Sequence, residues 1–429
     1  MKLKIAFISE HASPLALAGG VDSGGQNIYV NETALELSKH GFEIDIFTRK
    51  DDTALPEIVK LHNGIRVIHI HAGPEKFIPK EELMPFMKEF SSNMIRFIRS
   101  YKITYELVHA NFWMSGMVAM QVKMRLEIPF VITFHALGLV RSLYQKEADK
   151  FPRERSAIEK TIMQYADRII AECPQDAEDQ KKLYQAPAKN ISIIPCGFNP
   201  DEFHPVNKKE ARRYLKIPED THIMLQLGRV VPRKGIDTVI RSLSYLHDMP
   251  DLKLLVVGGD RDAENGPSVA ELKRLKRIAD EENVTGKVDF MGPHNHEELS
   301  YYYSAADVFV STPWYEPFGI TPVESMACGT PVIGSEVGGI KYTVLDGVTG
   351  LLVPPKNPNA LAEKVKVLIL NPAKRFAMGT AGIRRANDLF TWEKVVLKLQ
   401  DIYNSLLFSK RKHLFPVSDQ KIQSIHKSA

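Results

Sequence analysis

Two carboxylates, Glu316 and Glu324, stand eight residues apart in the segment Glu316-Pro-Phe-Gly-Ile-Thr-Pro-Val-Glu324. The segment follows an apolar run that ends in a turn. Such a strand-to-helix crossing is where an open α/β sheet binds a ligand. We expect Thr321 to cap a helix that begins at Pro322, with Glu316 on the loop and Glu324 in the first helical turn. The two carboxylates would then hold two parts of one extended polar ligand.

Three cations gather in the turn Gly228-Arg229-Val-Val-Pro-Arg233-Lys234-Gly235, which follows an expected strand. The guanidinium group of Arg can donate hydrogen bonds to two phosphate oxygens at once, whereas the Lys ammonium group acts as a point charge. At the carboxyl end of a strand, these side chains would neutralise a diphosphate. The alternative is a solvated basic turn, and the position at the strand end favours the ligand site.

Further candidates fall at strand ends in the first half of the chain. Gly24 and Gly25 end the loop after the first expected strand, where adjacent glycines let backbone N–H groups approach a phosphate or sugar. His135 follows another strand and faces the same edge. Glycine pairs also occur in ordinary loops, and a lone loop histidine is more often structural. Asn111, at a neighbouring strand end, would line the cleft or cap a turn.

The elements that must position these residues alternate between short apolar strands and helices, which is typical of parallel sheets built from βαβ units. In the first half we expect strands at Lys4–Ser9, Glu43–Thr48, Arg66–Ile70, Leu107–Ala110, Phe130–Thr133, Arg168–Ala171 and Ile191–Ile194. After residue 196 the series restarts, with strands at Ile223–Gly228, Lys253–Gly258, Val288–Met291, Val308–Ser311, Pro331–Gly334 and Gly350–Val353.

This alternation predicts an α/β protein with two Rossmann-like domains whose parallel sheets face each other across a cleft. A chain of 429 residues is also too long for one ordinary core. We place the first domain at residues 1–195 and the second at residues 196–390. A helix at residues 391–407 ends the second domain and would return to the first. Residues 408–429 form a basic tail that we expect to be disordered.

Charge and composition exclude several classes of protein. The chain has 56 Lys and Arg against 52 Asp and Glu, and five basic residues against one acidic in residues 410–429 supply the whole excess of four. The rest of the chain is neutral, so it offers no basic face for nucleic acid. Three cysteines with no ligand-like spacing argue against disulfides and a zinc site.

The chain should be cytoplasmic. Its first apolar stretch is too short for a signal peptide, and no apolar run reaches the roughly 18 residues that span a bilayer. A peripheral membrane contact is not favoured, and the sequence does not indicate an oligomeric state.

Together, these motifs resemble those of the retaining glycosyltransferases of family 4, which have the GT-B architecture. Four ordered motifs are a specific match. They are Asp22-Ser-Gly24-Gly25-Gln-Asn, Thr133-Phe-His135-Ala-Leu-Gly, Gly228-Arg229-x4-Lys234-Gly235 and Glu316-Pro-Phe-Gly-x4-Glu324-x3-Cys-Gly-Thr-Pro-Val. The segments His11-Ala-Ser-Pro-Leu and Ala72-Gly-Pro-x5-Lys80-Glu-Glu-Leu83 are most similar to the branch of sucrose-phosphate synthases and inositol-phosphate glycosyltransferases.

The resemblance implies a hexose transfer from a nucleotide-diphosphate sugar to an acceptor hydroxyl, without a metal or other cofactor. On it, Arg229 and Lys234 would hold the diphosphate, and Glu324 the ribose. Glu316 and His135 would contact the transferred sugar. Other implied donor-binding residues are Gly24, Gly25, Phe318 and Gly319, and the implied acceptor-binding residues are Gln26, Asn27, Lys80, Asn111 and Arg155. Retention by front-face attack, with the leaving diphosphate taking the acceptor proton, requires no general base.

The departures from the family pattern concern the acceptor. In the inositol-phosphate branch a Lys, an Arg, a Tyr and a Thr hold the acceptor phosphate. Lys80 and Arg155 match the first two, but Phe112 and Ala136 replace the two hydroxyls. Losing two hydrogen-bond donors from a charged group should cost a few kcal/mol of recognition. These residues are compatible with an unphosphorylated or differently placed acceptor, and a small sugar, a sugar phosphate, a cyclitol and a glycan or lipid-linked sugar all remain open.

Three alternatives are less favoured. A GT-B nucleotide-sugar epimerase would need a separate acid/base pair in the cleft. A non-catalytic sugar-nucleotide-binding protein would not need Arg229, Lys234, Glu316 and Glu324 together. An NAD-dependent dehydrogenase would need Gly-x-Gly-x-x-Gly after the first strand, followed by an acidic residue about 20 positions on, and neither is in place.

Overall fold

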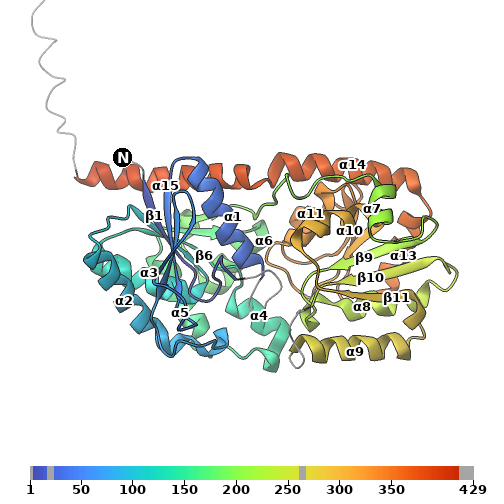
Figure 1. The fold of residues 1–429 in the computed structure, drawn as a ribbon, viewed down its shortest axis with the longest axis horizontal. Coiled ribbons are helices and arrows are strands. Elements are labelled where there is room, and N and C mark those ends of the chain that lie inside the picture. Colours follow the sequence, from blue (N-terminus) through green and yellow to red (C-terminus); the bar gives the residue numbers. More distant parts are fainter. Residues whose placement is uncertain (1–2, 17–23, 260–266, 415–429) are drawn as a thin grey trace, which may run out of the picture.

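The computed structural model describes residues 3–16, 24–259 and 267–414, which form two α/β domains side by side (Figure 1). The strands of the first domain are β1 (Lys4–Ile8), β2 (Glu43–Arg49), β3 (Ile58–His62), β4 (Ile65–Ile70), β5 (Leu107–Asn111), β6 (Phe130–Thr133), β7 (Arg168–Ala171) and β8 (Ile191–Ile193). Its helices are α1 (Gly25–Lys39), α2 (Met87–Ser100), α3 (Trp113–Leu126), α4 (Gly138–Gln145), α5 (Arg155–Tyr165) and α6 (Pro174–Tyr184).

The second domain repeats this plan with a six-stranded sheet. Its strands are β9 (His222–Leu227), β10 (Leu252–Val257), β11 (Val288–Gly292), β12 (Val308–Ser311), β13 (Val332–Ser335) and β14 (Gly350–Val353). Its helices are α7 (Lys208–Tyr214), α8 (Ile236–Ser242), α9 (Pro267–Glu281), α10 (Leu299–Ala305), α11 (Ile320–Ala327), α12 (Ile340–Thr343), α13 (Pro358–Ile369) and α14 (Pro372–Leu389).

The strand order in each sheet reverses at one point. The first sheet runs β3-β4-β2-β1-β5-β6-β7-β8, and the second runs β11-β10-β9-β12-β13-β14. Successive strands are therefore added towards one edge of the sheet before this point and towards the other edge after it. The switch lies between β1 and β5 in the first sheet and between β9 and β12 in the second. Open α/β sheets bind ligands outside the carboxyl ends of the strands at such a switch point. The region where the two switch points meet, which we call the crevice, holds a cavity lined by residues of both domains.

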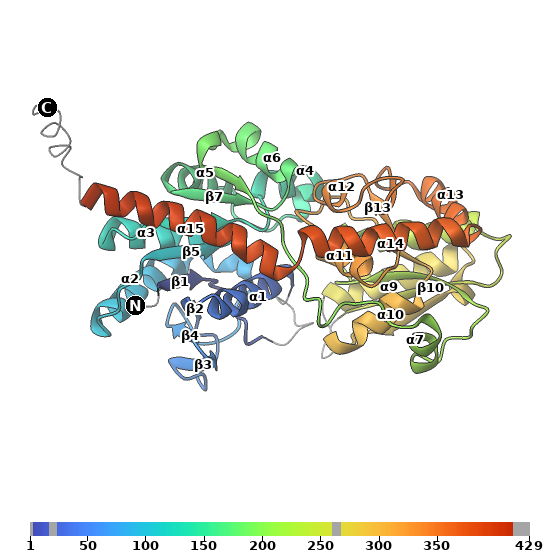
Figure 2. The ribbon, with the colours of Figure 1, turned by 90° about the horizontal axis from the view of Figure 1, so that it is seen from above.

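A final helix returns from the second domain to the first. Helix α15 (Trp392–Leu414) follows α14, and together the two run along both domains (Figures 1 and 2). The Tyr403 side chain of α15 lies 2.6 Å from His109 Nδ1, in the first domain. Helix α15 therefore ties the last segment of the chain to the core of the first domain.

Every strand that the apolar pattern predicted is present, with ends shifted by one residue at most. The pattern missed β3, a half-exposed edge strand that pairs antiparallel with β4. The returning helix continues to Leu414, beyond its expected end at residue 407. The remainder of the predicted tail, residues 415–429, lies outside the described residues. The domain boundaries themselves stay a prediction.

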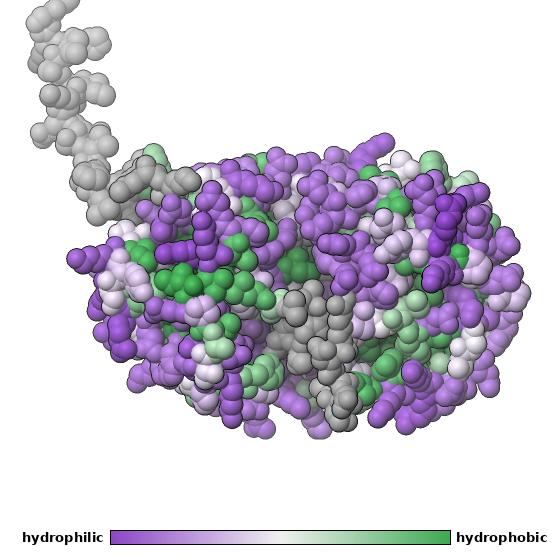
Figure 3. All heavy atoms as spheres, viewed as in Figure 1, coloured by the Kyte–Doolittle hydropathy of each residue, from purple (hydrophilic) through white to green (hydrophobic). Residues whose placement is uncertain are grey.

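Hydrophilic residues predominate on the face of the molecule that Figure 3 shows, where apolar residues form scattered patches. Across residues 3–16, 24–259 and 267–414, no helix has the length and apolar character to cross a bilayer.

Candidate active site

The two switch points meet at the start of helix α1. Gly24 caps this helix, and its amide donates to Asn27 Oδ1 over 3.0 Å. A Cβ atom on Gly24 would lie 3.7 Å from Arg229 Nη1, and one on Gly25 would lie 3.5 Å from Ile320 Cδ1, both in the second domain. The helix entrance that the sequence assigned to the ligand therefore faces the cation turn after β9.

Glu316 and Lys234 form an ion pair in this crevice. Lys234 Nζ lies 2.5 Å from Glu316 Oε2, and Arg233 Nη1 lies 3.4 Å from the same oxygen. Burial alone would raise the pKa of Glu316, but the charges of Lys234 and Arg233 outweigh it and hold that pKa below its ordinary value. Burial lowers the pKa of Lys234, and Glu316 opposes this shift. Glu316 is thus a fixed, ionised acceptor and a weak base.

A glycine turn that the sequence analysis did not single out supports the Glu316 loop. The amide of Gly339 donates to the Glu316 carbonyl over 2.9 Å. Gly338 has φ +43°, and a Cβ atom on either glycine would collide with the backbone of Glu316 or Phe318. The only signal in the sequence was two adjacent glycines shortly after an expected strand, a pattern also common in ordinary loops.

Glu324 lies deeper than Glu316 and has different partners. The Tyr303 hydroxyl donates to Glu324 Oε2 over 2.7 Å. Burial raises the pKa of Glu324, and the neighbouring His296 opposes that shift. Glu324 also lines a cavity of about 240 Å³ between the domains, together with residues of α1 such as Asn27. Glu324 therefore lines the interdomain cavity, whereas Glu316 is held in the turn with Lys234 and Arg233.

The helix that carries Glu324 begins earlier than the sequence predicted. Helix α11 starts at Ile320 with Gly319 as its N-cap, so the expected cap at Thr321 was wrong and Glu324 lies in the second turn. Gly319 turns the chain with φ +96°, a conformation that glycine adopts at no steric cost. The Phe318 side chain packs against Phe390 in the core, which leaves the backbone of Phe318 for any donor contact.

His135 is held rigidly at the carboxyl end of β6. Its Nδ1 lies 2.8 Å from Glu172 Oε1 and its Nε2 lies 3.1 Å from Asn111 Oδ1. Its backbone has φ +58°, an uncommon value for a residue other than glycine. Gln26 Nε2 donates to the Asn111 carbonyl over 3.2 Å. Three predicted site residues, Gln26 on α1, Asn111 and His135, thus converge at this edge, and the sequence did not point to Glu172 as a member of the site.

Arg155 is held by a buried carboxylate of its own helix. Its Nε lies 2.7 Å from Glu159 Oε1, and its Nη2 donates to the Ala136 carbonyl over 2.5 Å. The guanidinium group also lies over Phe112 and Phe151, at 5.0 and 4.5 Å from the ring centroids. Its charge is therefore already balanced inside the first domain.

Lys80, the other predicted phosphate ligand, lies in the connection between β4 and α2, at the start of a 3₁₀ turn.

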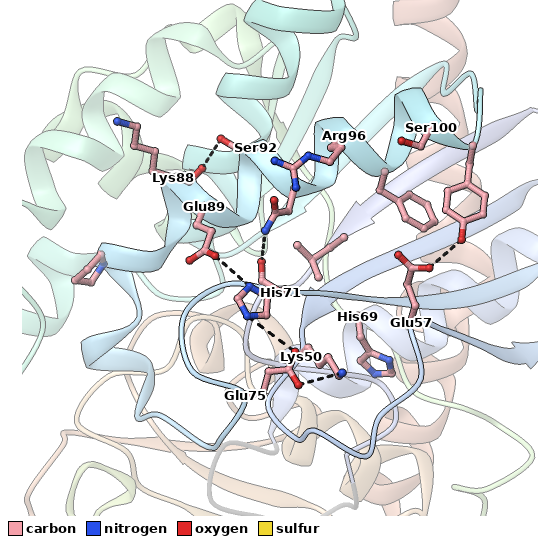
Figure 4. Close-up of a pocket in the computed structure, with 15 residues that line it drawn as sticks. Lys50, Glu57, His69, His71, Glu75, Lys88, Glu89, Ser92, Arg96 and Ser100 are labelled. Carbon is pink, nitrogen blue, oxygen red and sulfur yellow. Dashed lines mark hydrogen bonds and ion pairs between the residues drawn. The ribbon is translucent and has the colours of Figure 1, made fainter.

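A second cavity is a groove outside the crevice, between α2 and the edge of the first sheet (Figure 4). It encloses about 930 Å³. Its carboxylates pair with neighbouring groups: Glu75 with Lys50 at 3.1 Å, Glu89 with His71 at 3.0 Å, and Glu57 with the Tyr101 hydroxyl at 2.8 Å. These side chains satisfy one another, so we assign the groove no role in the site.

Among the described residues, no group of three or more His, Cys, Asp or Glu side chains is arranged to hold a metal ion.

Comparison with known proteins identifies the family. Residues 23–202 match the profile described as Glycosyltransferase Family 4, and residues 207–385 match Glycosyl transferases group 1. The chain is 34% identical to the D-inositol 3-phosphate glycosyltransferase of Corynebacterium glutamicum over 412 residues, which are 94% of this chain and 97% of that protein. The chain belongs to the family 4 glycosyltransferases. Both the expected family and the expected enzyme class are thereby confirmed.

A solved structure agrees with the GT-B fold of this glycosyltransferase. The sucrose-phosphate synthase of Thermosynechococcus elongatus superposes with a TM-score of 0.88 at 36% identity, covering 95% of this chain and all of that one. The UDP complex of HepE from Anabaena superposes at 0.75, but at 18% identity this similarity concerns the fold alone.

Proposed function

We propose that this glycosyltransferase moves a hexose from a nucleotide-diphosphate sugar to an acceptor hydroxyl, with retention of configuration and without a metal ion. The observation that carries the proposal is the pairing of Lys234 with Glu316 in the second domain, in the same turn as Arg229, which Gly24 of the first domain approaches. Cations and an ionised carboxylate lie together at the carboxyl ends of β9 and β12, where a diphosphate and the hydroxyls of its sugar would lie side by side.

The chemistry follows from where charge develops. The bond between the sugar and the diphosphate oxygen breaks, which leaves negative charge on the diphosphate, and fixed cations such as Arg229 and Lys234 stabilise that charge. A bond forms between the sugar carbon and the acceptor oxygen on the same face, and the acceptor proton passes to the leaving diphosphate. Glu316, whose pKa is held low, suits hydrogen bonding to sugar hydroxyls better than proton abstraction.

We further propose that the acceptor needs no phosphate. Arg155 is already neutralised by Glu159 and enclosed by aromatic rings, and Phe112 and Ala136 supply no hydroxyl. Arg155 Nη1 is buried and makes no hydrogen bond in the described structure, but a phosphate there would bring a second anion close to the buried Glu159 carboxylate, and the two negative charges would repel each other. A neutral hydroxyl acceptor avoids that repulsion.

The three cysteines are free thiols, which is compatible with a reducing cytoplasm, and we propose that the enzyme acts there.

A thermal-shift screen of UDP-glucose, GDP-mannose and ADP-glucose tests the donor assignment, because a ligand that binds only the folded state raises the melting temperature. Hydrolysis and transfer assays with the stabilising donor follow. Phosphorylated and unphosphorylated acceptors are then compared at equal concentrations. Absence of any shift would contradict the donor assignment, and transfer to phosphorylated acceptors alone would contradict the acceptor assignment.

A further inference from the structure

Helix α4 joins two parts of the site that belong to different domains. It begins three residues after His135 and ends at Gln145. At that end the ring of Tyr144 stacks on the ring of Tyr315, with centroids 5.3 Å apart and planes 24° from parallel. The side-chain amide of Gln145 also donates to the Tyr315 hydroxyl. Tyr315 immediately precedes Glu316. The first domain therefore contacts the second domain at the residue next to the carboxylate that we assign to the donor.

The first-domain end of this connection is anchored. The amide of Gly138, the first residue of α4, donates to both oxygens of Glu159 at 3.0 and 3.1 Å. A carboxylate at a helix N-terminus is favourable because it meets unpaired amides and the positive end of the helix dipole. Arg155 and the Tyr184 hydroxyl hold Glu159 in turn, at 2.7 and 2.5 Å. A helix of eight residues spans about 12 Å, so α4 is a short rigid link from this anchor to Tyr315.

The second-domain end is equally constrained. The Arg233 guanidinium lies over the Tyr315 ring at 5.5 Å and also 3.4 Å from Glu316. The amide of Trp314 donates to the Arg233 carbonyl over 2.9 Å. Tyr315 itself is buried. A displacement of Tyr315 would therefore move Arg233 and Glu316 together.

We propose that Tyr144 and Tyr315 are positioning residues that couple the approach of the two domains to the orientation of Glu316. This inference rests on the proposed function, because it assumes that Glu316 holds the transferred sugar. A diphosphate that binds Lys234 would take this partner away from Glu316. The stack of Tyr144 on Tyr315, together with Arg233, would then keep the Glu316 carboxylate in place. When the domains separate the stack is broken, so the full geometry forms only in the closed crevice, which also excludes water.

Variants of Tyr144 test the coupling, because this side chain is 42% exposed and its loss should not prevent folding. For Tyr144→Ala we expect kcat for transfer to fall about 10- to 100-fold, as for a slightly misplaced reacting group. The KM for the donor should change less than about threefold, since the binding contacts remain. Tyr144→Phe keeps the stack and should restore transfer. Tyr165→Ala, at an exposed tyrosine on α5, is the matched control and should behave as wild type.

A second arm needs no substrate. A double-mutant cycle on thermal unfolding with Tyr144→Ala and Tyr315→Ala should show non-additive shifts, because each change removes the same interdomain contact. Additive shifts, or a Tyr144→Ala enzyme with wild-type kcat, would overturn the inference. If wild type itself binds none of UDP-glucose, GDP-mannose and ADP-glucose, the proposed function fails, and the cycle still decides whether the contact couples the domains.

Discussion

Lys234 Nζ and Glu316 Oε2 lie 2.5 Å apart, which joins the turn after β9 to the loop after β12 at the point where the strand order reverses. Neither residue belongs to a regular strand or to the body of a long helix. Their separation is fixed by the two parallel strands that end beside them. The two residues are 82 positions apart in the sequence, yet their side chains form one ion pair.

Replacing Lys234 with Ala should weaken binding of the nucleotide-diphosphate donor by at least about tenfold, because a charged hydrogen bond to the phosphates is lost and Glu316 remains as a negative charge nearby. Isothermal titration with the stabilising donor measures the change. Lys209→Ala, at a largely exposed lysine of the same domain, should bind as wild type. Equal donor affinity of Lys234→Ala and Lys209→Ala would show that Lys234 does not hold the diphosphate.

Replacing Glu324 should change how the enzyme binds the ribose of the donor. The resemblance to family 4 assigns the ribose hydroxyls to the buried Glu324 carboxylate, and on that assignment wild type would bind a ribonucleoside diphosphate more tightly than its 2′-deoxy analogue. Replacing Glu324 with Ala should weaken the ribonucleotide by about tenfold and remove this discrimination. Titration of UDP against 2′-deoxy-UDP, or of the corresponding pair for another base, measures both effects. Discrimination that survives in Glu324→Ala would place the ribose elsewhere.

Sequence periodicity predicted the two sheets because parallel strands buried on both faces are short continuous apolar runs. The edge strand Ile58–His62 was not predicted because it is half-exposed and carries Lys60 and His62 among its apolar residues. The pairing of Glu316 with Lys234 could be anticipated, since both motifs end strands in one sheet. The stack of Tyr144 on Tyr315 could not, because contacts between domains leave no local pattern.

Replacing Arg155 with Met should lower stability markedly, because it leaves Glu159 as an unpaired buried carboxylate. Breaking a buried pair in this way costs about 3–5 kcal/mol, and both side chains are almost wholly buried. The double variant Arg155→Met/Glu159→Gln should recover part of that loss. Chemical denaturation of the three proteins measures it.

The competing explanation for Arg155 makes a different prediction. If Arg155 bound an acceptor phosphate, the single variant would keep its stability and raise KM for phosphorylated acceptors alone. That combination would contradict the structural role assigned to the Arg155–Glu159 pair.

Asp176 should make the stability of the protein depend on pH. Burial, with a further contribution from Glu172, raises the pKa of Asp176 from 3.8 to about 8. Between about pH 4 and pH 8 the folded protein therefore keeps a proton that the unfolded chain has released, so stability falls as pH rises through this window. Asn cannot ionise, and its carbonyl can still accept the Glu172 amide that now donates to Asp176 over 2.9 Å.

Asp176→Asn should accordingly melt at a higher temperature than wild type at pH 8.5, and the difference should shrink towards pH 5. A gain of about 1 kcal/mol corresponds to about 2–4 °C for domains of this size. Asp388→Asn, which removes an exposed charge from α14, controls for the change in net charge. Glu172, which holds His135, is unchanged in this variant, so the Asp176→Asn enzyme should keep its activity. A parallel pH dependence in wild type and Asp176→Asn would mean that another group is responsible.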